Sequence, residues 1–440
     1  MRYYLLPLAI LLSACATPQV DIQTSESAVN LSDAALLTAE AVTPPTAVLN
    51  TAATGQGDSA MAQAQRFAHW KDDFTRRAIA KGYSPQLLAI TVGRATMNER
   101  ALERDSSQPE FTRPVWSYIK SAASPERIER GQAELADHTA IFDELEQTYG
   151  VPRQILAAIW GLESSYGRIL GNHDIINSLA TFAFEGRRTK FGEAQLFASL
   201  DLIQSGAVRV EQLTGSWAGA MGMTQFIPTT FRDYAVDFDR NGNTDLWTSE
   251  ADALASAANY LTRSGWRPNE PVMAEVVVPV DFDYSQSEST KKTVAAWTAL
   301  GARPANGLQF SPAANQLEAK LLAPAGQRGP KLLVFKNFDV IKKYNNSTSY
   351  VMGIASLGEA LGGQTSIRNP WPEDDQPLTF KDKENMQKAL TAKGFDTGGV
   401  DGQVGPATRR AIRAWQSANG LPADGYVEQR LLARIMAPGR

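Results

Sequence analysis

Apolar residues recur at helical spacing through most of the chain beyond about residue 60. Phe67, Trp70 and Phe74 lie three or four positions apart, which places them on one face of a helix. The Ser-Pro-Glu sequence at 124–126 predicts another helix start, because serine caps a helix and proline fits its first turn. We expect that helix to run on toward Tyr149. The pattern predicts a mainly helical fold.

The pattern changes to alternation in the second half of the chain. Val-rich stretches at 272–282 and 332–335 have the period of two that is typical of β-strands. Residues 289–300, between them, are expected to form a helix. Helical spacing returns over 350–361 and ends at paired glycines. We interpret the region as a small α/β insertion in a mainly α (α+β) domain.

A proline-rich stretch separates the last part of the chain. Residues 370–377 contain three prolines and predict a linker. In the following segment, 378–437, the turn Asp401-Gly402 is echoed 23 positions later by Asp424-Gly425. We predict a small three-helix domain here. A helical cap on the larger domain would fit the same pattern.

The first residues have the pattern of an export signal. Arg2 precedes a short apolar run that ends in Leu-Ser-Ala-Cys15, and Cys15 is the one cysteine of the chain. The run is well short of the ~20 residues that span a bilayer. We predict a lipoprotein signal at 1–15 with Cys15 lipidated, or else an ordinary signal peptide. Residues 16–60, poor in aromatic residues, are predicted to be a disordered tether.

Composition removes several classes of function. A net charge of −4 with 20% charged residues gives no indication of a nucleic-acid-binding protein. The three histidines are scattered without zinc-binding spacing, and there is no glycine-rich phosphate loop.

One carboxylate is predicted to lie on an apolar helix face. Leu156, Ile159 and Trp160 lie seven, four and three residues before Glu163, so they share its face. Desolvation raises the pKa of a carboxyl group, and a neutral carboxyl near pH 7 can act as a general acid. A surface glutamate near a helix end explains this stretch equally well.

Three more stretches carry candidate chemistry. Residues 215–228 combine glycines, which let a ligand approach, with Ser216 and Gln225; a tightly packed helix junction is the alternative. Residues 237–245 match a calcium loop whose twelfth position is Thr248, so Asp252 is the candidate for the missing ligand. A plain Asx-rich turn is the other interpretation. Residues 344–350 place amides between two tyrosines, as in a sugar-binding wall or in a simple polar turn.

Together, the stretches 161–167, 218–228, the acidic loop at Asp237 and Tyr344-Asn-Asn-Ser resemble the family B lytic murein transglycosylases. The C-terminal segment resembles the small helical peptidoglycan-binding domain. The resemblance implies a lysozyme-like helical catalytic core within residues 61–369. Both resemblances imply the same polymer as substrate.

The resemblance also implies roles for individual residues. Glu163 would be the single catalytic acid and base, and Ser216 and Asn345 would bind the acetamido group of the muramic acid. The glycan groove would be lined by Gln225, Tyr118, Tyr260, Tyr344 and Tyr350. A structural Ca²⁺ would be held by Asp237, Asp239, Asn241, Asn243 and Asp252, although Thr248 and the spacing to Asp252 depart from the family pattern.

The implied reaction needs no cofactor for its chemistry. Glu163 would protonate the oxygen between N-acetylmuramic acid and N-acetylglucosamine, then take the proton of the C6 hydroxyl as a 1,6-anhydro ring closes. One alternative is a hydrolytic muramidase with a second carboxylate such as Glu185 or Glu193. Another is a non-catalytic, lipid-anchored scaffold that only binds peptidoglycan.

The expected partners and location follow from the same features. The partners would be peptidoglycan glycan strands, and a membrane through the lipid anchor only, with no nucleic acid. We expect a monomer in the periplasm. Its resemblance to bacterial lipoproteins implies an anchor in the outer membrane, since Ala16 rather than aspartate follows Cys15.

Overall fold

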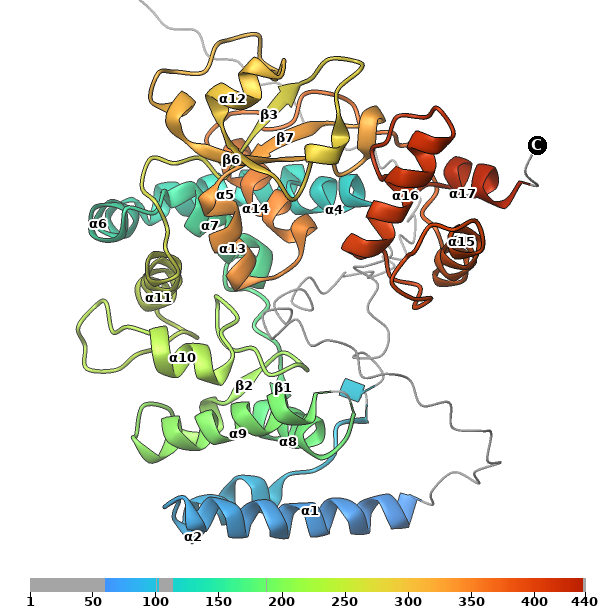
Figure 1. Cartoon of the computed structure of the whole chain (residues 1–440). Coiled ribbons are helices and arrows are strands. Elements are labelled where there is room, and N and C mark those ends of the chain that lie inside the picture. Colours follow the sequence, from blue (N-terminus) through green and yellow to red (C-terminus); the bar gives the residue numbers. More distant parts are fainter. Residues whose placement is uncertain (1–59, 100, 103–113, 187, 438–440) are drawn as a thin grey trace, which may run out of the picture. The chain divides into compact units, whose positions relative to one another are not determined.

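The computed structural model describes residues 60–99, 101–102, 114–186 and 188–437 (Figure 1). The predicted signal with Cys15 and the tether up to residue 59 lie outside the described residues. The α-helices are α1 Ala60–Ala80, α2 Pro85–Ile90, α4 Val115–Ala122, α5 Pro125–Asp137, α6 Thr139–Tyr149, α7 Arg153–Ser164, α8 Ile175–Phe184, α9 Thr189–Gln204, α10 Pro228–Tyr234, α11 Glu250–Arg263, α12 Val294–Ala299, α13 Lys336–Tyr344, α14 Thr348–Leu361, α15 Phe380–Ala392, α16 Pro406–Ala418 and α17 Gln429–Met436. Where the structure describes the chain, no helix is long and apolar enough to cross a membrane.

The strands form two small antiparallel sheets. One pairs β1 with β2, and the other has the order β4-β6-β7-β3-β5. The strands are β1 His173–Asp174, β2 Thr214–Gly215, β3 Met273–Val277, β4 Lys291–Thr293, β5 Arg303–Pro304, β6 Glu318–Leu322 and β7 Lys331–Val334. The mainly helical fold with a small insertion that contains strands is confirmed.

Two predicted elements differ from the structure. The helix expected to run from Ser124 toward Tyr149 is interrupted at His138, whose φ of −106° and ψ of 26° are not helical. His138 packs edge-on against Trp160 of α7, so a tertiary contact accompanies a break that no glycine or proline marks. The helix expected over 289–300 begins as strand β4 and is helical only in α12.

The site is built on the packing of α14 against α7 and α4 (Figure 1). Two glycines of α14 permit the close approach. A Cβ on Gly358 would lie 3.2 Å from the Ile155 Cδ1 of α7, and one on Gly353 would lie 2.8 Å from the Tyr118 Cε1 of α4. Larger residues at these two positions would push the three helices apart.

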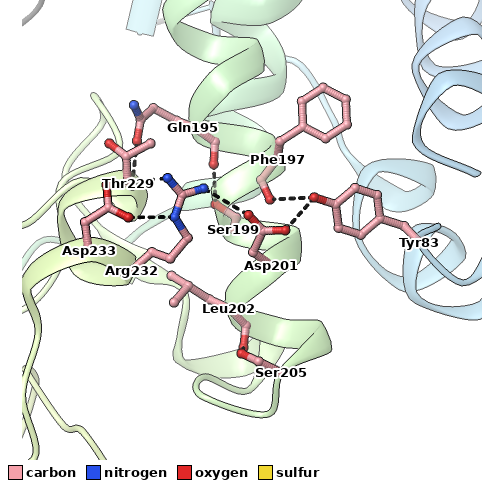
Figure 2. A network of polar contacts seen from close by, with 10 residues as sticks. All are labelled: Tyr83, Gln195, Phe197, Ser199, Asp201, Leu202, Ser205, Thr229, Arg232 and Asp233. Carbon is pink, nitrogen blue, oxygen red and sulfur yellow. Dashed lines mark hydrogen bonds and ion pairs between the residues drawn. The ribbon is translucent and has the colours of Figure 1, made fainter. Parts of the chain in front are cut away.

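A polar network fixes α10, the helix that follows the glycine-rich segment 214–228. Figure 2 shows Asp201 of α9 between two partners: it accepts hydrogen bonds from the Tyr83 hydroxyl at 2.6 Å and from Arg232 of α10 at 3.0 Å. Gln195, also on α9, accepts a bond from the Thr229 backbone N–H in the first turn of α10. These contacts anchor one end of the segment that carries Ser216 and Gln225.

The C-terminal helices α15, α16 and α17 enclose a hydrophobic core of their own. The two Asp-Gly turns, Asp401-Gly402 and Asp424-Gly425, are held by the same kind of hydrogen bond. The side-chain carbonyl of Gln387 accepts a bond from the Gly402 N–H, and that of Gln416 accepts one from the Gly425 N–H, both at 2.8 Å. Both glycines have positive φ. The predicted three-helix domain is confirmed.

Candidate active site

Glu163 lies in the last turn of α7, a helix enclosed by the protein. Gly150, in the left-handed conformation, ends α6, and Pro152 caps α7. Every residue of α7 from Ile155 to Ser164 is buried, so the predicted apolar face extends around the whole helix. Only 2% of Glu163 is exposed. The interpretation as a surface glutamate is therefore wrong.

The two oxygens of the Glu163 carboxyl have different surroundings. Oε1 accepts a hydrogen bond of 2.5 Å from the Tyr350 hydroxyl. Oε2 is buried and has no hydrogen-bond partner among the described residues. Burial raises the pKa of Glu163 to about 8, an effect that the bond from Tyr350 partly opposes. At neutral pH the carboxyl therefore keeps its proton.

Two of the predicted groove tyrosines, Tyr350 and Tyr344, interact with this carboxyl, and Tyr118 and Tyr260 lie next to them. Tyr350, Tyr344 and Tyr118 are only 1%, 6% and 8% exposed, so they form closely packed surroundings rather than open walls. The Tyr344 hydroxyl donates to the Thr224 carbonyl at 2.5 Å, and its ring packs edge-on against Tyr260 at 5.2 Å. Burial and the charge of Glu163 both hold the pKa of Tyr344 and of Tyr350 well above its ordinary value, so both remain hydrogen-bond donors.

The segment 214–228 folds tightly on itself. A Cβ on Gly215 would lie 2.0 Å from the Ala220 carbonyl oxygen, and one on Gly222 would lie 2.5 Å from that of Leu246. These glycines face the protein, as in the packed-junction interpretation. Ser216 Oγ accepts a bond from the Ala220 N–H. Gln225 has a φ of 50°, and its Nε2 donates to the Gly222 and Leu170 carbonyls.

Asn345 follows α13 directly and is completely buried. Its Oδ1 accepts a bond from the Ser347 N–H, and Ser347 in turn caps α14 by accepting from the Tyr350 N–H. The polar turn expected from the sequence is thus present. It also carries a buried side-chain amide next to Tyr344.

Several buried polar atoms in the described part of the chain lack a hydrogen-bond partner. Such atoms are uncommon in proteins, and in a candidate site they mark positions that a polar ligand can satisfy. Those in the segments described above are Glu163 Oε2, Thr224 Oγ1, Gln225 Oε1 and Asn345 Nδ2. Tyr344 and Tyr350 link these segments, since Tyr344 bonds the carbonyl of Thr224 and Tyr350 bonds Glu163.

The structure adds residues that the sequence reasoning did not select. Thr224 lies inside the 218–228 motif but was not singled out. Ser164, beside Glu163, donates from its hydroxyl to the Met223 carbonyl at 2.7 Å and so ties α7 to that motif. Both residues belong to recognised stretches, but nothing in their spacing shows which neighbour they contact.

The acidic loop has the geometry of a cation site. Asp237 accepts bonds from the Asn241 and Gly242 N–H groups, and Gly242 has a φ of 89° at the sharp turn. Carboxylate oxygens of Asp237, Asp239 and Asp252 lie within 4.8 Å of one another. Asp252, in the first turn of α11, accepts bonds from the backbone N–H groups of Phe238, Asp239 and Asp245. Hard oxygen donors at this spacing suit Ca²⁺.

Two other carboxylates considered from the sequence face α1. Glu193 forms an ion pair with Arg77, and Glu185 accepts a bond from Gln63. Both partners belong to α1, and neither contact involves α7.

The fold and the site together match a known family. A family model described as a transglycosylase SLT domain matches residues 66–359, and a peptidoglycan binding domain model matches residues 381–435. The chain belongs to the transglycosylase SLT family and is a lytic transglycosylase of peptidoglycan.

Particular relatives agree with this assignment. Membrane-bound lytic murein transglycosylase B of Escherichia coli (strain K12) is 31% identical over 270 residues, which cover 60% of this chain and 72% of that protein. The crystal structure of SltB3 from Pseudomonas aeruginosa in complex with NAG-anhNAM-pentapeptide has a TM-score of 0.81 at 45% identity, covering 84% of this chain and 99% of that one. The Escherichia coli lytic transglycosylase Slt35 in complex with calcium has a TM-score of 0.57 at 29% identity, covering 66% and 92%. The expected lysozyme-like helical core is confirmed.

Proposed function

We propose that this protein cleaves the β-1,4 bond between N-acetylmuramic acid and N-acetylglucosamine without water, with Glu163 as both acid and base. The product would carry a 1,6-anhydromuramic acid end. One observation carries the proposal: the buried Glu163 carboxyl is held through Oε1 by Tyr350, while Oε2 has no partner among the described residues.

In the first step, Glu163 donates its proton from Oε2 to the glycosidic oxygen. The bond between this oxygen and C1 of the muramic acid breaks, and its electron pair leaves with the oxygen. Positive charge then develops at C1, where the acetamido oxygen of the substrate can stabilise it. Ser216 and Asn345 are suited to hold that acetamido group, because a hydroxyl and the unpartnered amide Nδ2 can donate to its oxygen.

In the second step, the ionised Glu163 accepts the proton of the C6 hydroxyl while O6 bonds to C1. Glu163 is thereby returned to its acid form and no water is consumed. The pKa of about 8 suits both steps, since a group that gives and then takes a proton works best when its pKa is near the working pH. Tyr350 stabilises the carboxylate between the steps.

Two observations favour a single carboxyl over a pair. The pKa of Glu163 is set by burial and by Tyr350, with no second acid among the groups that shift it. Glu185 and Glu193 are bound to residues of α1. The relative SltB3 was crystallised with an anhydro sugar ligand, which fits a water-free reaction in the family.

We also propose that Ca²⁺ binds the acidic loop as a structural ion. The ligands would be the carboxylates of Asp237, Asp239 and Asp252, with Asn241 and Asn243 completing the set. The clustering of three carboxylates and the calcium complex of the relative Slt35 support this site. The ion would fix the connection between α10 and α11, and the glycosidic chemistry would need no cofactor.

For location, we propose a periplasmic monomer that is anchored to the outer membrane through Cys15. The Escherichia coli relative is named as membrane-bound, which is consistent with an anchor. The C-terminal domain, 378–437, would hold the polymer while the catalytic domain, 61–369, cuts it, with 370–377 as the linker between them.

Mass spectrometry of the sugars released from purified sacculi tests the function. We expect products lighter by one water than hydrolytic muropeptides, and no release by Glu163→Gln. The matched controls Glu185→Gln and Glu193→Gln should keep the activity, because their carboxylates face α1. Hydrated reducing ends would establish a muramidase instead, and equal traces of release from wild type and Glu163→Gln would establish a binding scaffold.

A further inference from the structure

The backbone directly after Glu163 adopts an unusual conformation. Ser165, Tyr166 and Gly167 have φ values of 51°, 59° and 78°, all in the left-handed region. Residues with a Cβ seldom adopt this region, and two such residues in succession are rarer still. A conformation of this kind persists only where the surrounding structure holds it.

The Tyr166 side chain occupies a slot between two glycines. A Cβ on Gly161 of α7 would lie 2.6 Å from Tyr166 Cζ, and a Cβ on Gly131 of α5 would lie 2.2 Å from its hydroxyl oxygen. The hydroxyl donates to the Arg127 carbonyl at 2.9 Å, and the ring packs edge-on against Trp160 at 5.6 Å. Neither glycine position can carry a side chain while Tyr166 is seated.

A second contact holds the same turn from the other side. The Ser164 hydroxyl donates to the Met223 carbonyl and accepts a bond from the Gly167 N–H at 2.9 Å. Two residues just after Glu163 are therefore anchored. Tyr166 is held by α5, and Ser164 is held by the 214–228 segment. These anchors fix how the last turn of α7 is rotated, and that rotation places the carboxyl within 2.5 Å of Tyr350.

We propose that Tyr166 is a positioning residue for the reaction. Locked between Gly131 and Gly161, it sets the last turn of α7 and so keeps the Glu163 carboxyl buried and bonded to Tyr350. The inference rests on the proposed role of Glu163 as the acid.

The charged and titratable neighbours of the two side chains differ. Tyr350 of α14 acts on Glu163 through its hydrogen bond, and Glu163 in turn raises the pKa of Tyr344 on α13. Those that act on Tyr166 are Arg127, Glu134 and Arg130, all on α5. A change in the pH–rate profile of a Tyr166 variant would thus report an altered setting of Glu163.

The test compares Tyr166→Leu, which empties the slot, with Tyr166→Phe, which keeps the ring. For Tyr166→Leu we expect kcat per folded molecule to fall roughly 10- to 100-fold with KM nearly unchanged, as for other small misplacements of a catalytic group. The alkaline limb of the pH–rate profile should move to lower pH, because a more hydrated Glu163 loses its proton more easily. Tyr166→Phe should stay close to wild type in both respects.

Gly131→Ala provides an independent variant that leaves α7 unchanged. Its Cβ would displace the Tyr166 hydroxyl, so we expect the same loss of kcat and the same shift of the alkaline limb. Adding Tyr166→Phe should restore part of the activity of Gly131→Ala, since the atom nearest to that Cβ is removed, while the contact with Leu361 Cδ2 at 2.6 Å stays. If Tyr166→Leu does not fold, this pair still tests the proposal.

A matched control is Phe74→Leu, which shortens a fully buried aromatic side chain in α1. It should lower the melting temperature and leave both kcat per folded molecule and the pH limb unchanged. The proposal is overturned if Tyr166→Leu and Gly131→Ala behave in the same way as this control. Activity retained by Glu163→Gln would instead refute the proposed function, whatever the Tyr166 variants do.

Discussion

Two opposing influences act on the proton of Glu163. Burial favours the neutral carboxyl, and the hydrogen bond from Tyr350 favours the carboxylate. Burial prevails, which leaves Glu163 an acid at neutral pH. Tyr350 lowers the cost of the carboxylate that exists between the two proposed steps.

Tyr350→Phe is expected to reduce kcat about 10- to 100-fold, the equivalent of the roughly 1.5–3 kcal/mol of a hydrogen bond to a charged group. Without that bond the pKa of Glu163 rises further, so the alkaline limb of the pH–rate profile should move to higher pH. This direction is opposite to that expected for Tyr166→Leu. A limb that stays in place would show that Tyr350 does not act on the Glu163 proton.

The same pKa predicts how stability depends on pH. Folded Glu163 keeps its proton up to about pH 8, whereas the unfolded chain releases it near 4.5. The stabilisation from the neutral buried carboxyl is therefore fully present below pH 4.5 and is lost as pH rises toward 8, by up to about 1.4 kcal/mol per pH unit. Glu163→Gln lacks this dependence, so its free energy of unfolding relative to wild type should increase between pH 5 and 8. Urea denaturation at several pH values measures the difference, and a constant difference would contradict the burial of the charge.

At the scale of single residues, the sequence revealed the candidate acid but not the hydrogen bond that it accepts. Three apolar residues at helical spacing were enough to place Glu163 on an apolar face. The contact with Tyr350 joins residues 187 positions apart, and periodicity contains no information about such pairs. The left-handed φ of Tyr166 was equally hidden, because a tyrosine gives no local signal for it.

At the level of elements, the acidic loop connects α10 with α11 through a network of carboxylates. Asp252 accepts three backbone hydrogen bonds from the loop while lying in the first turn of α11. An ion bound to Asp237, Asp239 and Asp252 would stabilise this connection, since it would bind the folded loop and not the unfolded chain.

Chelation of calcium is therefore expected to lower the melting temperature by several degrees, as loss of a few kcal/mol does in a domain of this size. Asp252→Asn should abolish most of the difference between calcium and chelator. Asp233→Asn is the control, because Asp233 pairs with Arg232 on α10 and lies outside both the loop and the carboxylate cluster. Differential scanning fluorimetry measures these melting temperatures. An equal difference between calcium and chelator in wild type and both variants would argue against this site.

Elements with strong local signals were predicted best. The capped helix α5 begins at the residue that the sequence indicates, Pro125. The break at His138 and the strand β6 were not predicted. The first is accompanied by packing of His138 against Trp160, and the second depends on pairing with β4 and β7. Tertiary partners, rather than local preference, decide both.

At the scale of the whole molecule, the C-terminal helices have a core separate from that of the catalytic helices. The sequence predicted this separation through the prolines of 370–377 and the repeated Asp-Gly turns. The anchor and tether lie outside the described residues, so they remain predictions.

Removal of residues 378–437 is expected to leave kcat on short soluble glycan fragments nearly unchanged. Binding to intact sacculi should weaken about 10-fold or more, because two linked modules bind one polymer more tightly than either does alone. Co-sedimentation with sacculi and turnover of soluble fragments measure the two effects separately. Loss of turnover on soluble fragments by a stably folded truncated protein would show that the C-terminal domain takes part in catalysis.

The burial of α7 on every side has a consequence for how the enzyme must open to its substrate. Backbone amides in such a helix exchange with deuterium only when a large part of the protein unfolds. The proposed acid, Glu163, therefore lies on a segment that we expect to be among the slowest to exchange, unlike catalytic groups on mobile loops. Any breathing that admits a glycan strand must come from the elements around α7, so amide exchange during substrate binding should change in those elements while α7 remains protected.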